Sequence, residues 1–322
     1  MSRSAFLIFN PVAGQGDPDE ELAIIQQHLE PEFELEIAQT TPEKDAAQLA
    51  RQAKAQNAEC VIVAGGDGTI SAVVTVLAKT KIPVGLIPRG TANAFVQALH
   101  LPQDIAAACD VIVGGRTCQI DLGCCNDNYM TLFASVGFGA EMVEKADREL
   151  KNKLGVLAYF AAGLHNWLTL DSFEFEIETD NRTITGEASA IAIANAAPAF
   201  SILAQGPANI IWDDSLLDIT LIAPKNRASA LMASFYLFKT ALRDVEADSR
   251  QDVGYFQSRW AKITANPPQK VVIDGELVGK TPIEVLCVPK ALTVFVPRAF
   301  DSLEASGNVE HLEGLSKFTV QD

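Results

Sequence analysis

The pentapeptide Gly65-Gly66-Asp67-Gly68-Thr69 constrains the fold of this chain more than any other stretch of its sequence. It follows an apolar run at residues 60–64, which is typical of a buried strand, and precedes a helix-like segment at residues 70–79. Glycines let a backbone approach an anion closely, and the N–H groups of a helix's first turn favour negative charge. The order strand, glycine turn, helix therefore predicts a phosphate-binding loop. Because the Asp67 carboxylate cannot bind phosphate by itself, we expect a divalent cation, a ribose hydroxyl or a proton between them.

The first third of the sequence alternates between strand and helix patterns. Strands are expected at residues 5–9, 33–38, 60–64 and 83–87, and helices at residues 19–29, 45–56, 70–78 and 92–99. Apolar strands that alternate with helices are typical of a parallel sheet covered on both faces. We therefore expect a Rossmann-like three-layer α/β domain at residues 1–120.

After about residue 118 the pattern changes to alternating polar and apolar residues, which indicates strands buried on one face. Strands are expected at residues 129–135, 173–179, 188–194, 217–222, 270–273, 283–288 and 292–296, with helices only near 140–168 and 227–243. This pattern predicts a β-rich second domain at residues 121–300. For residues 301–322 we expect an acidic tail or a helix that packs back on the first domain.

Composition excludes several classes of protein. The chain has 322 residues, too many for one ordinary core, and a formal net charge of −16, which argues against nucleic acid as a partner. The six cysteines form no C-x-x-C pair and no signal peptide is recognisable, so we expect a reduced, cytoplasmic protein. The longest apolar stretches are shorter than the roughly 20 residues that a membrane-spanning helix needs.

Two further glycine-bearing loops are expected at the same edge of the sheet as residues 65–69. Residues 10–14 read Asn-Pro-Val-Ala-Gly and follow the first predicted strand, and Gly90-Thr91 follows the fourth. In an open α/β sheet the carboxyl ends of parallel strands meet at one edge, where ligands bind. One such loop is weak evidence, since glycine turns after strands are common. Three of them at one edge predict a nucleotide site.

Two common nucleotide-binding motifs are not supported. Residues 275–281 resemble a Walker motif, but they have three residues rather than four between the glycines and lie in a hairpin-like stretch. The fingerprint G-x-G-x-x-G has no match at a predicted strand-to-helix turn. Rossmann-type NAD binding is therefore not indicated.

Four motifs in order resemble the diacylglycerol kinase catalytic domain family, specifically its soluble bacterial lipid kinases. They are Asn10-Pro-Val-Ala-Gly14, Gly65-Gly-Asp-Gly-Thr69, Pro88-Arg-Gly-Thr-Ala-Asn93 and Val272-Ile-Asp-Gly-Glu276. The resemblance extends over about residues 5–297. It implies a kinase that transfers the γ-phosphate of ATP to a lipid hydroxyl, such as that of diacylglycerol. It also implies an active site in a cleft between the α/β domain and a C-terminal β-sandwich domain.

The resemblance assigns the cofactors ATP and Mg²⁺ to particular positions. The nucleotide-binding residues would be Asn10, Pro11, Val12, Ala13, Gly14, Thr40, Gly65, Gly66, Asp67, Gly68, Thr69, Ile70, Ser71 and Thr91. The family's magnesium-binding turn corresponds to Asp214, whose side chain would bind the ion together with the backbone carbonyls of Ile211 and Leu216. Ser215 replaces the usual glycine, and it would be strained if this position needs a positive φ. Ala94 stands where many members carry an aspartate.

The catalytic candidates are Glu276, Asp274 and Asp67. Asp274-Gly-Glu276 lies between two predicted strands, and from spacing alone it is a plain hairpin turn, since Asp-Gly favours such turns. The resemblance points instead to Glu276 as the proton acceptor for the substrate hydroxyl, with Asp274 beside it. The sequence does not decide between these two carboxylates. Asp67 would act as a direct or water-mediated metal partner.

Two other functions stay open. One is an NAD kinase-like enzyme with the same phosphate loop and a polar nucleotide as acceptor, and the other is a non-catalytic nucleotide- or lipid-binding module. An apolar cleft and lipid turnover would distinguish the lipid kinase. As partners we expect a lipid substrate reached by peripheral, transient contact with a membrane surface, and a second copy of the chain in a homodimer. Diacylglycerol, phosphatidylglycerol and a sphingoid base are all compatible acceptors.

Overall fold

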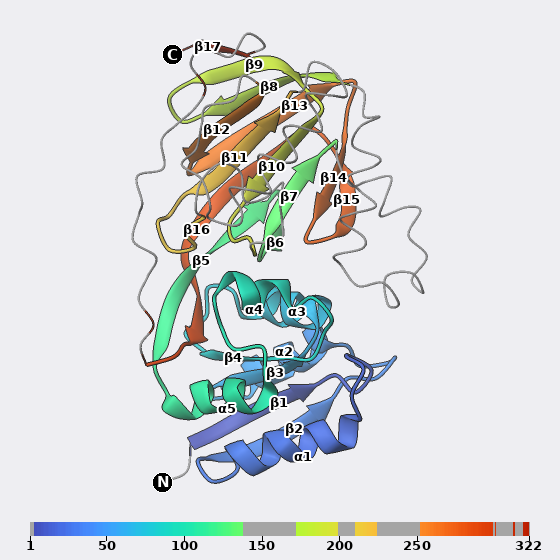
Figure 1. Cartoon of the computed structure of the whole chain (residues 1–322), viewed down its shortest axis with the longest axis vertical. Helices are drawn as coiled ribbons and strands as arrows, with labels where there is room; N and C mark the ends of the chain where they lie inside the picture. Colours follow the sequence, from blue (N-terminus) through green and yellow to red (C-terminus); the bar gives the residue numbers. More distant parts are fainter. Residues whose placement is uncertain are drawn as a thin grey trace. The chain divides into compact units, whose positions relative to one another are not determined.

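The computed structural model of the chain (Figure 1) describes residues 3–137, 172–198, 210–223, 252–298, 300, 312 and 318–321. The chain divides into two units, Met1–Leu122 with Pro289–Ser302 and Gly123–Val288 with Leu303–Asp322. We call them unit 1 and unit 2. The helices expected near 140–168 and 227–243 lie outside the described residues.

Unit 1 is an α/β unit in which strands and helices alternate as the sequence predicts, followed by a further helix at Ile105–Gly114 that the sequence did not indicate. They are β1 (Arg3–Phe9), α1 (Pro18–Leu29), β2 (Phe33–Gln39), α2 (Ala46–Ala55), β3 (Val61–Gly65), α3 (Asp67–Leu77), β4 (Val84–Pro88), α4 (Ala94–Ala98) and α5 (Ile105–Gly114). The four strands are parallel, in the spatial order β4-β3-β1-β2. All five residues of β3 and of β4 are buried, because helices cover both faces of a parallel sheet.

The helices of unit 1 form two outer layers. Helices α1 and α5 pack together on one face of the sheet, and α2 and α3 pack together on the other (Figure 1). On the first face, Ile25 and Leu29 of α1 and Ile112 of α5 lie in one hydrophobic cluster with strand residues such as Leu7 and Ile62. This confirms the expected three-layer arrangement.

Unit 2 is built from strands. Strands β5 (Thr117–Cys125) and β16 (Ile283–Phe295) carry the chain between the units, and the others are β6 (Asn128–Met130), β7 (Phe133–Val136), β8 (Phe173–Thr179), β9 (Thr183–Ala188), β10 (Ala190–Ala194), β11 (Leu217–Ile222), β12 (Val253–Ser258), β13 (Trp260–Asn266), β14 (Lys270–Ile273), β15 (Glu276–Lys280) and β17 (Phe318–Gln321). One sheet has the order β12-β11-β10-β7-β14-β15, and the other strands of the unit run β17-β9-β8-β13-β16, with β5 paired to β16 and β6 to β5.

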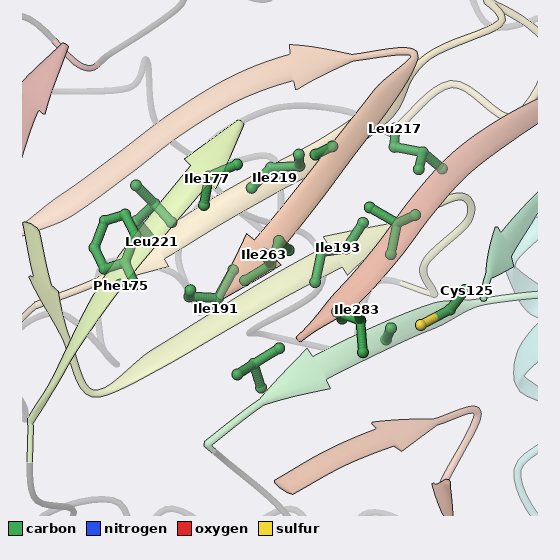
Figure 2. Close-up of a cluster of buried hydrophobic side chains, with 14 of the residues drawn as sticks. Cys125, Phe175, Ile177, Ile191, Ile193, Leu217, Ile219, Leu221, Ile263 and Ile283 are labelled. Carbon is green, nitrogen blue, oxygen red and sulfur yellow. The ribbon is translucent and has the colours of Figure 1, made fainter. Parts of the chain in front are cut away.

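The core of unit 2 lies between these two sets of strands. Figure 2 shows Ile191, Ile193 and Leu221 from β10 and β11 in one cluster with Phe175 and Ile177 from β8. Strand β8 reads Phe-Glu-Phe-Glu-Ile-Glu-Thr, and its first five residues alternate between buried and exposed. Such alternation places every second side chain in the core. The β-sandwich expected for the second domain is therefore present.

The end of the chain differs from the expected tail or helix on the first domain. Phe318–Gln321 form strand β17, which pairs antiparallel with β9 of unit 2. The ring of Phe318 packs against Phe175, with 5.7 Å between the ring centroids. An alternating Phe-Thr-Val-Gln segment suits an edge strand, where one face packs on the sheet and the other meets solvent.

None of the helices in the described part of the chain has the length and hydropathy that a membrane span requires.

Candidate active site

The order of strands in unit 1 fixes where a ligand can bind. Strand β1 pairs with β2 on one side and with β3 on the other, so the strand order reverses between β1 and β3. In doubly wound sheets the crevice outside the carboxyl ends of the strands at such a point is the ligand site. Asn10 follows β1 and Gly66 follows β3, so the two loops that the motifs single out flank this point.

The loops after β1 and β3 are joined by a side-chain hydrogen bond. The Asn10 Nδ2 group donates to Thr69 Oγ1 over 2.8 Å, and Asn10 Oδ1 accepts the backbone N–H of Val12 over 3.2 Å. Asn10 therefore acts first as a structural tie between the loop at residues 10–14 and the first turn of α3. Within that loop Val12 is 88% exposed, the largest exposure of any large apolar side chain in the described residues.

The loops after β3 and β4 touch through their backbones. A Cβ atom built on Gly90 would lie 2.7 Å from the Cα of Gly66, closer than real Cβ contacts allow. Asn93 closes this second loop, because its side chain accepts the N–H of Gly90 over 2.7 Å and donates to the Gly90 carbonyl over 2.9 Å. A residue with a side chain at position 90 would push the two loops apart.

The N-terminus of α3 differs from those of the other long helices. Helices α1, α2 and α5 begin after Asp17, Asp45 and Asp104, and each aspartate accepts N–H groups from the first turn. Helix α3 begins after Gly66 and has no side-chain cap. Its first-turn amides and dipole can therefore stabilise an anion such as a nucleotide phosphate.

Asp67, the first residue of α3, has a structural partner that the sequence did not indicate. Its Oδ1 accepts the backbone N–H of Phe95 over 3.4 Å, so the carboxylate lies at the first turn of α4. Burial raises the pKa of Asp67, and the backbone amides of Phe95, Ala94 and Asn93 oppose this shift. The carboxylate thus ties the glycine loop to the segment after β4.

The remaining nucleotide candidates lie in different environments. Thr40 follows β2, and its N–H donates to the Phe9 carbonyl over 2.9 Å, so it belongs to the same edge of the sheet. Thr91 is exposed beside Gly90. Ile70 is fully buried, and its N–H donates to the Gly66 carbonyl within the helix, so its contribution is to packing. Ser71 is half-buried in the second turn of α3.

The turn between β14 and β15 in unit 2 separates the two carboxylate candidates by their environments. Asp274 and Gly275 have φ values of 47° and 87°, as in a two-residue hairpin turn. The Asp274 carboxylate accepts four hydrogen bonds, from the N–H and hydroxyl of Thr131 at 2.7 and 2.8 Å, the N–H of Leu132 at 3.0 Å and the N–H of Phe133 at 3.1 Å. Burial raises the pKa of Asp274, and these donors oppose the shift. The Asp274 side chain therefore has a structural role, in which its hydrogen bonds hold residues 131–133 in place.

Glu276, two residues after Asp274, is exposed. It is the first residue of β15, whose five residues are all exposed at the edge of the sheet. Within the described ranges no protein group hydrogen-bonds to its carboxylate, so Glu276 can accept a proton or a hydrogen bond from a ligand.

The turn expected to bind magnesium adopts the backbone conformation that the family glycine suggested. Ser215 has a φ of 66°, in the left-handed region, and the N–H of Leu216 donates to Asp214 Oδ1 over 2.9 Å. A single carboxylate with backbone carbonyls is a hard oxygen donor set, which suits Mg²⁺. No group of three or more histidine, cysteine or acidic side chains able to bind a metal occurs in the part of the chain that the structure describes. The residues present fit a magnesium ion bound mostly by backbone oxygens.

A buried polar network adjoins this turn, and the sequence did not predict it. Gln257 donates to both Asp214 Oδ2 and Asp218 Oδ1 over 3.2 Å, and the Tyr255 hydroxyl donates to Asp218 Oδ1. Asp218 is 1% exposed, and burial raises its pKa to about 7. Gln257 and Tyr255 lie on β12, and the pairing of β12 with β11 brings both of them to Asp218. In the sequence, Tyr255 and Gln257 stand on either side of an apolar residue, and this pattern does not indicate a function.

The glycine loop lies in unit 1, whereas Asp214, Asp274 and Glu276 lie in unit 2. The expectation that these elements share a cleft remains a prediction.

Comparisons with known proteins agree with the two units. The family model of the diacylglycerol kinase catalytic domain matches residues 4–125, and that of the YegS C-terminal NAD kinase beta sandwich-like domain matches residues 133–296. The uncharacterized protein sll0036 of Synechocystis is 46% identical over 307 residues, which cover 92% of this chain and 71% of that protein.

Relatives with a named activity are more distant but cover nearly their whole length. A diacylglycerol kinase of Bacillus subtilis is 29% identical over 302 residues, covering 92% of this chain and 97% of the relative. A crystal structure from Bacillus anthracis, provisionally assigned as a diacylglycerol kinase, superposes with a TM-score of 0.79 at 26% identity and covers 93% of this chain and 98% of its own. An α/β unit with phosphate-binding features and a β-sandwich are thus the parts of a known class of kinase. The chain belongs to the diacylglycerol kinase catalytic domain family.

Proposed function

We propose that the chain is an ATP-dependent lipid kinase whose acceptor is the hydroxyl of diacylglycerol or a closely related lipid. The observation that carries the proposal is the cluster of three loops around the uncapped N-terminus of α3, in a chain that belongs to this family. The first-turn amides of α3 bind the phosphates of the nucleotide. The loop at residues 10–14 and Thr91 contact the rest of it.

The reaction needs a base and a means of offsetting negative charge. The lipid hydroxyl oxygen forms a bond to the γ-phosphorus, the bond from that phosphorus to the β–γ bridging oxygen breaks, and ADP leaves. Glu276 accepts the hydroxyl proton. This role is supported by the exposure of Glu276 and by the hydrogen bonds that already occupy the Asp274 carboxylate. Asp214 and the backbone carbonyls of Ile211 and Leu216 would hold a magnesium ion, which would supply positive charge. Asp67 positions the glycine loop through its contact with α4.

An NAD kinase-like activity is the main alternative. The second unit matches a domain described as NAD kinase-like, and that fold by itself does not decide the acceptor. Peripheral contact with a membrane surface and a homodimer belong to our proposal as expectations.

A panel of acceptors distinguishes these possibilities. Purified full-length chain is incubated with γ-labelled ATP, Mg²⁺ and, separately, diacylglycerol, phosphatidylglycerol, a sphingoid base and NAD. We expect label in the lipid extract, with diacylglycerol as the best acceptor, and none in NAD. Label in NAD with none in any lipid contradicts the proposal, and so does an absence of transfer to every acceptor.

A further inference from the structure

Arg89 is a buried charge at the nucleotide edge of unit 1. It follows β4 directly, its backbone N–H donates to the Gly65 carbonyl over 2.9 Å, and the residue is 4% exposed. Burying a guanidinium costs several kcal/mol unless other groups pair with it. The groups that pair with Arg89 therefore show what the residue holds together.

The partners of the guanidinium come from two other segments, α1 and the end of β1 with the residue that follows it. Its Nε donates to Glu21 Oε2 of α1 over 2.6 Å, and its Nη2 lies 2.6 Å from the same oxygen. Its Nη1 donates to the backbone carbonyl of Asn10, and its Cζ lies 4.1 Å from the centroid of the Phe9 ring. A carboxylate, a carbonyl and an aromatic face together compensate the buried charge.

Arg89 also touches the other end of the same loop. Gly14 has a φ of 81°, and a Cβ atom there would clash with the carbonyl oxygen of Arg89. The loop at residues 10–14 is thus held at Asn10 by the Arg89 side chain and packs at Gly14 against the Arg89 backbone.

We infer that Arg89, paired with Glu21, is a positioning residue that holds the loop at residues 10–14 in the shape that binds the nucleotide. This inference rests on the proposed function. The Arg89 side chain acts through Asn10, which is itself bonded to the first turn of α3 through Thr69. Movement of Asn10 therefore changes both the loop and the phosphate site.

Arg89→Lys tests this inference. Lysine keeps the positive charge, but its single ammonium cannot reproduce the planar fork that reaches Glu21 and Asn10 together. We expect ATP to bind roughly tenfold more weakly, a change of about 1.4 kcal/mol in binding free energy, because the variant loses a charge-assisted hydrogen bond that holds the loop. At saturating lipid, the KM for ATP should rise by a similar factor, whereas a purely structural role would leave it unchanged.

Arg3→Lys is the matched control. Arg3 also lies over an aromatic ring, with Cζ 4.2 Å from the centroid of Phe33, and donates to a backbone carbonyl, that of Val113, over 3.1 Å. It stands at the first residue of β1, at the opposite end of the strand from Asn10. A purely structural role would lower the melting temperature in both variants alike and leave ATP affinity unchanged in both.

Calorimetric titration of each full-length variant with ATP and Mg²⁺ gives the dissociation constant, and a thermal melt reports folding. Weaker ATP binding in Arg89→Lys but not in Arg3→Lys is the expected result. Equal ATP affinity in Arg89→Lys and wild type overturns the inference, and so does equal weakening in both variants. Should Arg89→Lys fail to fold, Glu21→Gln, a milder change to the same pair, replaces it, and unchanged ATP affinity there has the same meaning. A wild-type chain that binds no ATP contradicts the proposed function itself.

Discussion

Asp274 and Glu276 are only two positions apart in the sequence, but their carboxylates lie in different environments. Asp274 accepts hydrogen bonds from Thr131, Leu132 and Phe133, whereas Glu276 is exposed at the start of an edge strand. The sequence could not make this distinction, because the donors to Asp274 lie about 140 positions earlier in the chain and carry no local signal. Family resemblance indicated the turn, and the geometry gives its two carboxylates different surroundings.

Asp274→Asn should destabilise the fold. Asparagine has nearly the same shape and tolerates a positive φ, but it presents an NH₂ group to N–H donors that the carboxylate satisfied. We expect the free energy of unfolding, measured in urea, to fall by about 2–3 kcal/mol. Glu276→Gln, at an exposed position, should change it by less than about 0.5 kcal/mol. Equal stability of the two variants would show that the Asp274 hydrogen bonds do not support the fold.

Among the helices and strands, the first turn of α3 is the feature on which the proposed nucleotide site depends. The other helices of ten or more residues in the described part of unit 1 begin with a capping aspartate, and α3 begins with Gly66. The sequence predicted this helix and its glycine turn correctly, since both are local patterns. It did not predict that Asp67 contacts α4 or that Gly66 and Gly90 approach each other, because these contacts depend on the pairing of β3 with β4.

Gly66→Asp and Gly66→Ala should differ in ATP binding. Both variants add a Cβ atom 3.3 Å from the Gly90 Cα, so both carry the same steric cost. Only aspartate adds a carboxylate that can cap α3 and repel a phosphate. We expect Gly66→Asp to bind ATP at least roughly tenfold more weakly than Gly66→Ala. Equal dissociation constants for the pair would argue that the nucleotide phosphates lie elsewhere.

The strands of unit 1 were predicted better than those of unit 2, and helix α5 was not predicted. In unit 1 all four strands were located. Strands β1, β3 and β4 are apolar runs, and such runs are typical of strands buried between two layers of helices, whereas β2 at the edge of the sheet is only partly buried. In unit 2 the expected strands at residues 283–288 and 292–296 are one strand, β16, which continues through Pro289 and Lys290 despite a φ of 52° at Lys290. No strand range was predicted for β9, β12, β13 or β15. In β15 all residues are exposed, so its sequence has no buried-face pattern.

For the molecule as a whole, the Asp218 carboxyl group, which is buried beside the proposed magnesium turn, makes the free energy of unfolding depend on pH. The pKa of Asp218 rises from its ordinary value of 3.8 to about 7, mainly through burial. Between about pH 4 and pH 7 the unfolded chain releases a proton that the folded chain retains. A rise in pH over this window therefore lowers the free energy of unfolding, by at most about 1.4 kcal/mol per pH unit.

Asp218→Asn should remove this dependence. The amide resembles the protonated carboxyl group and still accepts from Tyr255. Urea unfolding in metal-free buffer at pH 5 and pH 8 should show that the variant gains stability relative to wild type at the higher pH. A difference between variant and wild type that is the same at both pH values would contradict the assigned pKa.

The central claim is that the chain transfers phosphate to a lipid hydroxyl with Glu276 as the base. The most direct measurement is the rate of label transfer from γ-labelled ATP to diacylglycerol by wild type, Glu276→Gln and the control Glu284→Gln, an exposed glutamate on β16. We predict that Glu276→Gln loses at least about 100-fold in kcat while its dissociation constant for ATP stays within about twofold, and that Glu284→Gln behaves as wild type. Full activity in Glu276→Gln would contradict the account.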